Sequence, residues 1–386
     1  MSNKNIMISA GEASGDLHAA NLVKALHKID ASIQVHGMGS RQLQEAGATL
    51  LVDCADIAVV GLIEVIAHYG DIKRALNTLT NSLRNNPPDL LILVDYQEFN
   101  FRLAKTAKRL GIKVLFYISP QVWAWRPHRV HTIGKLIDMM AVLFPFEETF
   151  YRNANVPVTF VGHPLVDDTQ PNKSLTDCIT EYQLNTHKKI IGIFPGSRKG
   201  EIKRVLPILL DTAELLMSRH ADVQFILPVA STLSIDFIQP FLAAHTHLNI
   251  RVVKDRPYNI MQTCQVIMTA SGTATLEIAL MGIPNAIVYR IAPISYFILK
   301  RMITIDHIGL VNIVAEKNIV KEYIQHLAKP QDIANEIEQL LYDQSYRNNM
   351  ITELGKVREK LGKEGGSNNI AQLAYDMLAT DWKAPA

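Results

Sequence analysis

The feature that most constrains the fold is a repeated alternation of short aliphatic runs with longer amphipathic segments. Helical patterns begin near residue 14 and cover residues 101–110. The aliphatic runs of the first part lie at residues 5–10, 33–36, 90–94, 113–118, 139–143 and 158–161. Strands that alternate with helices along a chain form a parallel sheet. The pattern therefore predicts an α/β domain with a doubly wound parallel sheet that ends near residue 165.

A second cycle of the same kind follows a polar stretch, residues 167–188, which is predicted to be a linker with one short helix. Its predicted helices include residues 201–219 and 273–281, and from residue 332 onward the pattern is helical. Its predicted strands are residues 190–194, 223–227, 250–253, 266–269 and 286–289. We therefore expect Rossmann-like lobes at 1–165 and 186–365, a closing helix within 366–386, and a cleft between the lobes. Ligands of such sheets bind beyond the carboxyl ends of the strands.

Composition excludes several classes of protein. The 386 residues are 48% hydrophobic and 20% charged, which excludes disordered, collagen-like and coiled-coil chains. The 39 basic and 37 acidic residues leave a net charge of only +2, so nucleic acid is not an expected partner. The three cysteines fit neither a disulfide framework nor a metal knuckle, which favours the cytosol. No apolar run reaches the ~18 residues of a membrane span, so any membrane contact is expected to be peripheral.

The first predicted strand runs into Gly11-Glu12-Ala13-Ser14-Gly15-Asp16 and then into a helix. Two glycines allow a tight turn and a close ligand approach to the N–H groups at the helix start. The spacing matches neither the dinucleotide-binding nor the P-loop pattern, which argues against an NAD enzyme and an ATPase. A plain turn, with Ser14 or Asp16 capping the helix, is the alternative.

Two segments of the second lobe place small and charged residues between a strand and a helix. In the first, Gly196, Ser197 and Arg198 combine a flexible turn, a hydroxyl and a guanidinium, which suits a pyrophosphate. The second comprises Ser271, Gly272, Thr273, Ala274, Thr275 and, one turn later, Glu277. We expect Glu277 to accept hydrogen bonds from the two hydroxyls of a ribose. Together the segments predict a nucleotide-diphosphate site, and solvated helix starts are the alternative for each.

Two further segments of the first lobe carry candidate residues. Asp95 follows the aliphatic strand 90–94 and is placed for general-base work on a hydroxyl, with Glu98 as a competing carboxylate and a helix cap or turn as the alternative. Trp123 lies in a loop rich in aromatic and basic residues, which suits a sugar face or an acyl chain. His128-x-x-His131 and His245-x-His247 lack the neighbouring ligands of a metal site, so no metal or other cofactor is expected.

Six ordered motifs together give the chain a resemblance to a known family. They are residues 11–16, 119–126, 144–147, 161–164, 195–198 and 271–277. In this order and spacing they resemble the lipid-A-disaccharide synthase family of Gram-negative bacteria. The resemblance implies the GT-B glycosyltransferase fold, in which two Rossmann-like lobes with parallel sheets face a central cleft. It also implies a donor-site role for Asn312.

The resemblance further implies a reaction. UDP-2,3-diacylglucosamine would donate its sugar to lipid X, which is 2,3-diacylglucosamine 1-phosphate, and the β-1,6 disaccharide 1-phosphate and UDP would form with inversion. Arg198 and the two helix starts would bind the diphosphate, and Asp95 would deprotonate the acceptor. Glu12, Ser14, Asp16, Glu98 and Trp123 would be candidates for the acceptor side. One departure concerns residues 95–100, Asp-Tyr-Gln-Glu-Phe-Asn, where the family usually has Asp-Ala-Pro-Asp-Phe-Asn.

The resemblance also bears on location. Because both substrates carry acyl chains, it implies a cytoplasmic protein that lies peripherally on the inner membrane, and it allows a homodimer. Two apolar stretches with basic neighbours, residues 59–67 and 294–305, are the candidate membrane contacts. The alternatives are an enzyme like a UDP-GlcNAc 2-epimerase, another GT-B enzyme, or a nucleotide-sugar binding protein without catalysis.

Overall fold

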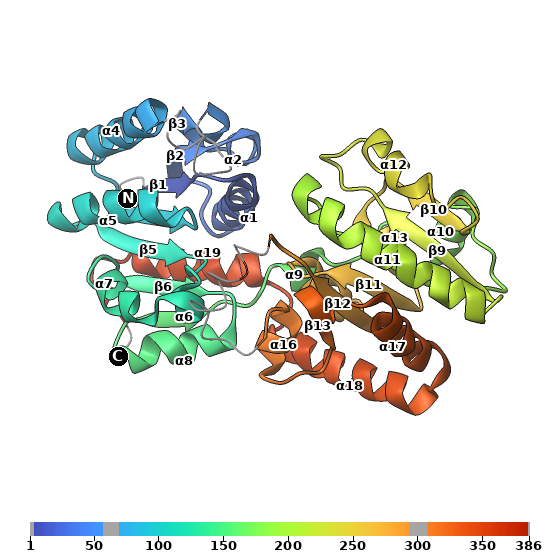
Figure 1. The fold of residues 1–386 in the computed structure, drawn as a ribbon. Coiled ribbons are helices and arrows are strands. Elements are labelled where there is room, and N and C mark those ends of the chain that lie inside the picture. Colours follow the sequence, from blue (N-terminus) through green and yellow to red (C-terminus); the bar gives the residue numbers. More distant parts are fainter. Residues whose placement is uncertain (1–3, 57–68, 293–295, 297–306, 385–386) are drawn as a thin grey trace. The chain divides into compact units, whose positions relative to one another are not determined.

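The computed structural model describes residues 4–56, 69–292, 296 and 307–384. The chain divides into two compact units (Figure 1). The first unit contains Met1–Pro164 and Leu361–Ala386, and the second contains Leu165–Lys360. The domain limits at 165, 186 and 366 were predicted from the sequence pattern, whereas these units are defined by contacts in space, so the limits stay predictions.

In its described part, the first unit has a parallel sheet of seven strands in the order β3-β2-β1-β4-β5-β6-β7. The strands are β1 (Asn5–Ala10), β2 (Gln34–Gly39), β3 (Thr49–Asp53), β4 (Leu90–Val94), β5 (Lys113–Tyr117), β6 (Met139–Val142) and β7 (Val158–Phe160). Strands β1 and β4 pair in register from Ile6 with Leu90 to Ala10 with Val94. All five residues of β4 are buried, because helices cover both faces of a doubly wound sheet.

The helices of the first unit follow the strands. They are α1 (Ala13–Ile29), α2 (Arg41–Glu45), α4 (Tyr69–Asn85), α5 (Gln97–Arg109), α6 (Val122–Trp125), α7 (Val130–Gly134), α8 (Pro145–Asn153) and α19 (Gly366–Met377), with short 3-10 turns at Cys54–Asp56 and Pro127–Arg129. Helix α19 comes from the far end of the chain and packs on α1 (Figure 1). The backbone N–H of His163 donates to the carbonyl of Leu361 at 3.0 Å, and Lys113 Nζ donates to the carbonyl of Met377 at 2.9 Å.

The described part of the second unit has a parallel sheet of six strands in the order β10-β9-β8-β11-β12-β13. The strands are β8 (Lys189–Phe194), β9 (Val223–Pro228), β10 (Ile250–Val253), β11 (Val266–Ala270), β12 (Asn285–Tyr289) and β13 (Glu322–Ile324). The helices are α9 (Leu165–Asp168), α10 (Leu175–Glu181), α11 (Lys199–Arg219), α12 (Gln239–Leu242), α13 (Pro257–Met261), α14 (Ala274–Leu280), α16 (Leu310–Ala315), α17 (Pro330–Tyr342) and α18 (Gln344–Lys360), with 3-10 turns at Ile235–Phe237 and Gln325–Leu327.

The prediction of two Rossmann-like parallel sheets is confirmed, and most predicted strands agree with the structure to within a residue or two. Two strands escaped prediction. β3 and β13 lie at sheet edges, and neither has a fully buried residue. An edge strand needs no continuous aliphatic run, so its sequence resembles a loop.

Candidate active site

The second unit has a pocket of about 650 Å³ at the carboxyl ends of its central strands. In the order β10-β9-β8-β11-β12-β13, the chain reverses its direction of winding between β8 and β11. Doubly wound sheets bind their ligands beside such a reversal. The pocket is lined by Phe194, Pro195, Gly196, Ser197, Arg198, Glu201, Pro228, Val229, Ala230, Ser231, Lys254, Asp255, Arg256, Pro257, Met261, Thr269, Ala270, Ser271, Gly272, Thr273, Ala274 and Glu277.

The turn from β8 to α11 supplies the first set of predicted residues. Gly196 has φ +97°, which glycine adopts without steric cost. Ser197 and Arg198 are exposed and line the pocket, and Arg198 is the N-cap residue of α11. Such a helix start favours an anion.

The turn from β11 to α14 supplies the second set. Ser271 Oγ donates to the carbonyl of Ile308 at 3.3 Å, and Thr273 is the N-cap residue of α14. Thr275 is fully buried, and its Oγ1 donates to the carbonyl of Gly272 at 2.8 Å. Gly272, Thr273 and Ala274 line the pocket. Thr275 does not line it and instead stabilises the turn through its hydrogen bond to Gly272.

Glu277 faces the same pocket from the first turn of α14. Its Oε1 accepts a hydrogen bond from the Tyr258 hydroxyl at 2.8 Å. Burial raises the pKa of the Glu277 carboxyl. Glu277 is thus a half-buried acceptor on the pocket wall, which agrees with what the recognition of a ribose needs.

Asn312 lies outside the pocket lining. Its Nδ2 donates to the Val320 carbonyl and to Glu322 Oε1, both at 2.7 Å, and its Oδ1 accepts from the backbone N–H groups of Ile319 and Val320, both at 3.0 Å. The side chain is fully buried. In this structure Asn312 ties α16 to the segment before β13.

The structure adds residues that the sequence reasoning missed. Lys254 and Arg256 follow β10 and line the pocket with cationic groups. Lys254 Nζ donates to the carbonyl of Leu233 at 2.8 Å, and the Arg256 guanidinium lies 5.2 Å from the centre of the Tyr258 ring. The sequence could have indicated them, because both residues closely follow a predicted strand, as the two turns do.

In the first unit Asp95 lies where the chain reverses its winding direction, between β1 and β4. Both Asp95 (φ +48°) and Tyr96 (φ +44°) have left-handed backbone conformations. Non-glycine residues hold such conformations only where their surroundings enforce them. Here the Asp95 N–H donates to the Tyr117 carbonyl at 3.1 Å, and Asn100 Nδ2 donates to the Asp95 carbonyl at 2.7 Å. Burial, and secondly the charge of Glu12, raises the pKa of Asp95 to about 6.

The turn after β1 contributes to the same place. A Cβ on Gly11 would lie 2.2 Å from Cδ1 of Tyr96, so only glycine fits against this ring. Glu12 and Ser14 are exposed. Asp16 is buried, and its carboxylate accepts from the backbone N–H groups of Ser40 (2.6 Å), Gln42 (3.1 Å) and Leu43 (3.3 Å).

The capping alternative for this turn is therefore wrong in one respect. The N-cap residue of α1 is Glu12, and no side chain caps it. Asp16 instead satisfies the free N–H groups at the start of α2, a helix that is distant in sequence.

Glu98 and Trp123 are engaged within the first unit. Arg129 Nη1 lies 2.8 Å from Glu98 Oε1 in an ion pair, and the Glu98 side chain is mostly exposed. The Trp123 indole donates to Glu147 Oε1 at 3.0 Å and packs edge-on against Phe146. Burial raises the pKa of Glu147 to about 7. These contacts fix the Trp123 ring beside a buried acid.

Within the described ranges, no group of three or more histidine, cysteine or acidic side chains is arranged to hold a metal ion. Likewise, no helix among the described residues is both long and apolar enough to cross a bilayer. The predicted membrane contacts at residues 59–67 and 294–305 fall outside the described residues, apart from Tyr296.

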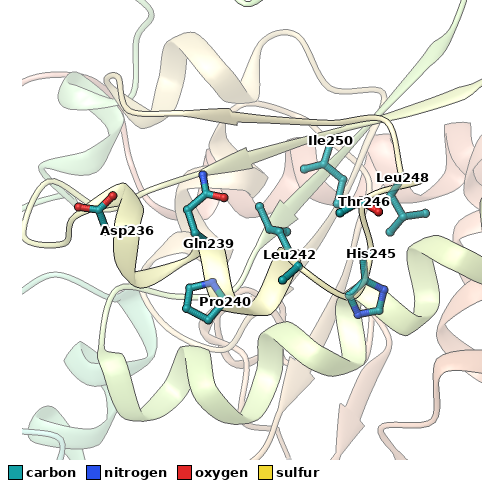
Figure 2. Close-up of a pocket in the computed structure, with 9 residues that line it drawn as sticks. Asp236, Gln239, Pro240, Leu242, His245, Thr246, Leu248 and Ile250 are labelled. Carbon is teal, nitrogen blue, oxygen red and sulfur yellow. The ribbon is translucent and has the colours of Figure 1, made fainter.

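A second pocket, of about 580 Å³, lies beside α12 and the start of β10 in the second unit (Figure 2). Leu242, Leu248 and Ile250 supply apolar walls, and Asp236 and Gln239 lie at one end. None of the residues predicted to bind or react lines this pocket. We therefore consider one candidate site in each unit, at the reversal of winding of its own sheet.

Comparison with known proteins decides the family. Residues 6–375 match the family described as lipid-A-disaccharide synthetase. The chain is 50% identical over 373 residues to the lipid-A-disaccharide synthase of Geobacter sulfurreducens, which covers 97% of each protein. The chain belongs to the lipid-A-disaccharide synthase family. The Coxiella burnetii (strain Dugway 5J108-111) member is 40% identical over 378 residues, which covers 98% of this chain and 100% of that protein. The prediction of a glycosyltransferase of this family is confirmed.

Solved structures share the fold of this family member at low identity. The S. aureus MnaA-UDP co-structure has a TM-score of 0.65 at 14% identity and covers 99% of this chain and 100% of that one. The Acinetobacter baumannii MurG structure has a TM-score of 0.57 at 16% identity and covers 96% of this chain and 99% of that one. The predicted GT-B fold class is thereby confirmed.

Proposed function

We propose that the protein transfers 2,3-diacylglucosamine from UDP-2,3-diacylglucosamine to lipid X, and so forms the β-1,6 disaccharide 1-phosphate and UDP. The observation that carries this proposal is the pocket of about 650 Å³ in the second unit. Residues of two helix-start turns line it, together with Arg198 and Glu277. A nucleoside diphosphate has the complementary groups. Membership of the family supports the choice of sugar and acceptor.

The donor is held by complementary charge. The N–H groups of the turn 196–198 and the Arg198 guanidinium bind the diphosphate, because free N–H groups and the helix dipole favour anions. Residues 271–274 present the second helix start on the opposite side of the reversal. Glu277, held by Tyr258, accepts the ribose hydroxyls. As the sugar departs, the same donors stabilise the charge that develops on UDP.

The acceptor is activated by one base. Asp95 accepts the proton of the 6-hydroxyl of lipid X while that oxygen forms a bond to the anomeric carbon of the donor sugar. The bond from that carbon to the UDP oxygen breaks with its electron pair on UDP. Attack on the face opposite the leaving group inverts the configuration, so one displacement needs neither a covalent nucleophile nor a cofactor. Burial of Asp95 raises its pKa to about 6 and so makes it a better proton acceptor than an exposed aspartate.

We further propose that the enzyme works at the cytoplasmic face of the inner membrane, because both substrates carry acyl chains. The apolar stretches 59–67 and 294–305, with the basic residues near them, would contact anionic lipid. Co-sedimentation with anionic vesicles tests this part, and light scattering in detergent tests whether the protein is a homodimer.

The reaction itself is tested in mixed micelles. UDP-2,3-diacylglucosamine is supplied with and without lipid X, with and without EDTA, and the UDP released is measured. The expected result is release that requires lipid X and persists in EDTA, together with a disaccharide product. Turnover without lipid X would indicate an epimerase or a hydrolase instead. Donor binding without turnover would indicate a nucleotide-sugar binding protein.

A further inference from the structure

The carboxylate of Glu201 lies inside the turn that faces the pocket. A Cβ placed on Gly196 would lie 2.0 Å from Oε2 and 2.4 Å from Cδ of Glu201, so the carboxylate rests directly on the glycine. Glu201 is in the first turn of α11 and lines the pocket. The side chain thus folds back over the start of its own helix.

The carboxylate uses the donors that the turn offers. The backbone N–H groups of Ser197 and Arg198, together with the positive charge of Arg198, favour the ionised form of this carboxylate, which lies against Gly196 at the start of α11. Burial raises the pKa of Glu201 in spite of these contacts. Burial raises the pKa of the Tyr289 hydroxyl at the end of β12, and the charge of Glu201 adds to this effect.

A phosphate group needs the same donors. Each backbone N–H donates one strong hydrogen bond, so the N–H groups of Ser197 and Arg198 cannot serve the carboxylate and a phosphate oxygen fully at once. Two anions side by side also repel each other. A diphosphate that enters this turn must therefore displace the Glu201 carboxylate, and the carboxylate can return when the diphosphate leaves.

We propose that Glu201 is an internal competitor for the diphosphate, which weakens the binding of the nucleotide product and speeds its release. The inference rests on the proposed function, since it takes a nucleoside diphosphate as the ligand of the turn. The contact also stabilises the start of α11, as a glutamate at this helix position commonly does. If Glu201 mainly competes with the diphosphate, its removal should strengthen nucleotide binding. If it mainly stabilises the start of α11, its removal should weaken nucleotide binding.

The test compares Glu201→Gln with the wild-type protein and with Asp211→Asn. Glutamine keeps the length and one acceptor oxygen but loses the charge, and Asp211 is an exposed acid on the same helix outside the pocket lining. The dissociation constants of UDP, UMP and uridine are measured by calorimetry, and the melting temperature is recorded for each variant. Stopped-flow displacement gives the rate of UDP release.

In Glu201→Gln we expect UDP to bind roughly tenfold more tightly, with slower release, because a like charge is removed. The gain should be smaller for UMP and absent for uridine, and Asp211→Asn should match the wild type. UDP affinity that is unchanged or weaker in Glu201→Gln would overturn the inference.

Two further measurements keep the test decisive. If Glu201→Gln melts at a much lower temperature, Glu201→Asp replaces it, because the shorter carboxylate withdraws from Gly196; tighter UDP binding supports the inference and weaker binding overturns it. A wild-type protein that does not bind UDP at all would instead overturn the proposed function on which the inference rests.

Discussion

At the scale of single residues, Asp95 shows how a common side chain acquires an uncommon property. Exposed aspartates are ionised near neutral pH and accept protons poorly. Asp95 is half-buried directly after β4, near the charge of Glu12, and its backbone has a left-handed conformation. Asn100 helps to enforce that conformation, and its own Oδ1 accepts from Ser9 Oγ at 2.7 Å.

Asp95→Asn should lower kcat by about 10²–10⁴-fold, the usual contribution of a general base, and leave the dissociation constant of UDP unchanged. In the wild type the base must be deprotonated. Activity should therefore fall as the pH decreases through about 6, the raised pKa of Asp95. Steady-state kinetics across pH 4.5–8.5 and calorimetry check both points. Turnover near the wild-type rate in the variant would assign the base to another residue.

Arg198→Ala should weaken UDP binding roughly 10–100-fold and reduce turnover, because a charge-assisted contact to the diphosphate is lost. Arg251→Ala is the matched control, since Arg251 is an exposed arginine of β10 in the same unit and does not line the pocket. Calorimetry with UDP compares the two variants. Equal affinities for both would remove Arg198 from the donor site.

At the scale of elements, the turns after the strands carry the chemistry and the strands hold them in place. The turn between β1 and α1 is anchored at a distance, because Asp16 on α1 satisfies three N–H groups at the start of α2. This contact fixes α1 against the end of β2 and so positions Gly11 and Glu12 beside Asp95.

Asp16→Ala should destabilise the first unit by roughly 1–3 kcal/mol, because buried N–H groups at the start of α2 lose their acceptor. Ser14→Ala is the control for stability, since Ser14 is an exposed residue of the same helix turn. Urea unfolding followed by circular dichroism measures both. A difference below a few tenths of a kcal/mol between them would contradict the assigned contact.

At the scale of the whole molecule, the chain forms two units, each built around a parallel sheet. Both sheets reverse their winding between the first and fourth strands of the unit, and both candidate sites lie at that reversal. Helix α19 adds its fully buried Ile370 to the first unit although the second unit lies between them in sequence. Interactions concentrate within each unit, so each should respond separately to damage in its own core.

Ile370→Ala should destabilise the first unit by roughly 2–5 kcal/mol through a new cavity and leave UDP affinity unchanged. The matched variant is Ile337→Ala on α17, which removes an equally buried isoleucine from the second unit and should destabilise that unit, which holds the proposed nucleotide pocket. Hydrogen exchange resolved along the chain, together with UDP calorimetry, distinguishes the two. Faster exchange throughout both units in either variant would contradict their independence.

Much of this protein follows from the sequence alone. The aliphatic runs form the central strands because a strand buried on both faces must be apolar along its length. The glycine and hydroxyl residues directly after those strands mark Gly196, Ser197 and Ser271 as loop residues at one sheet edge. These features depend on the side chains of consecutive residues, so the sequence is enough to predict them.

Only the tertiary structure decided the remainder, because it depends on which distant segments meet. Asp16 could not be assigned to α2, nor Asn312 to the segment before β13, without the contacts that use up their hydrogen bonds. Lys254 and Arg256 line the pocket because the carboxyl ends of β10, β8 and β11 lie on the same side of the parallel sheet. The raised pKa of Asp95 arises from burial and from the charge of Glu12, which lies more than 80 residues away along the chain, so no run of neighbouring residues encodes it.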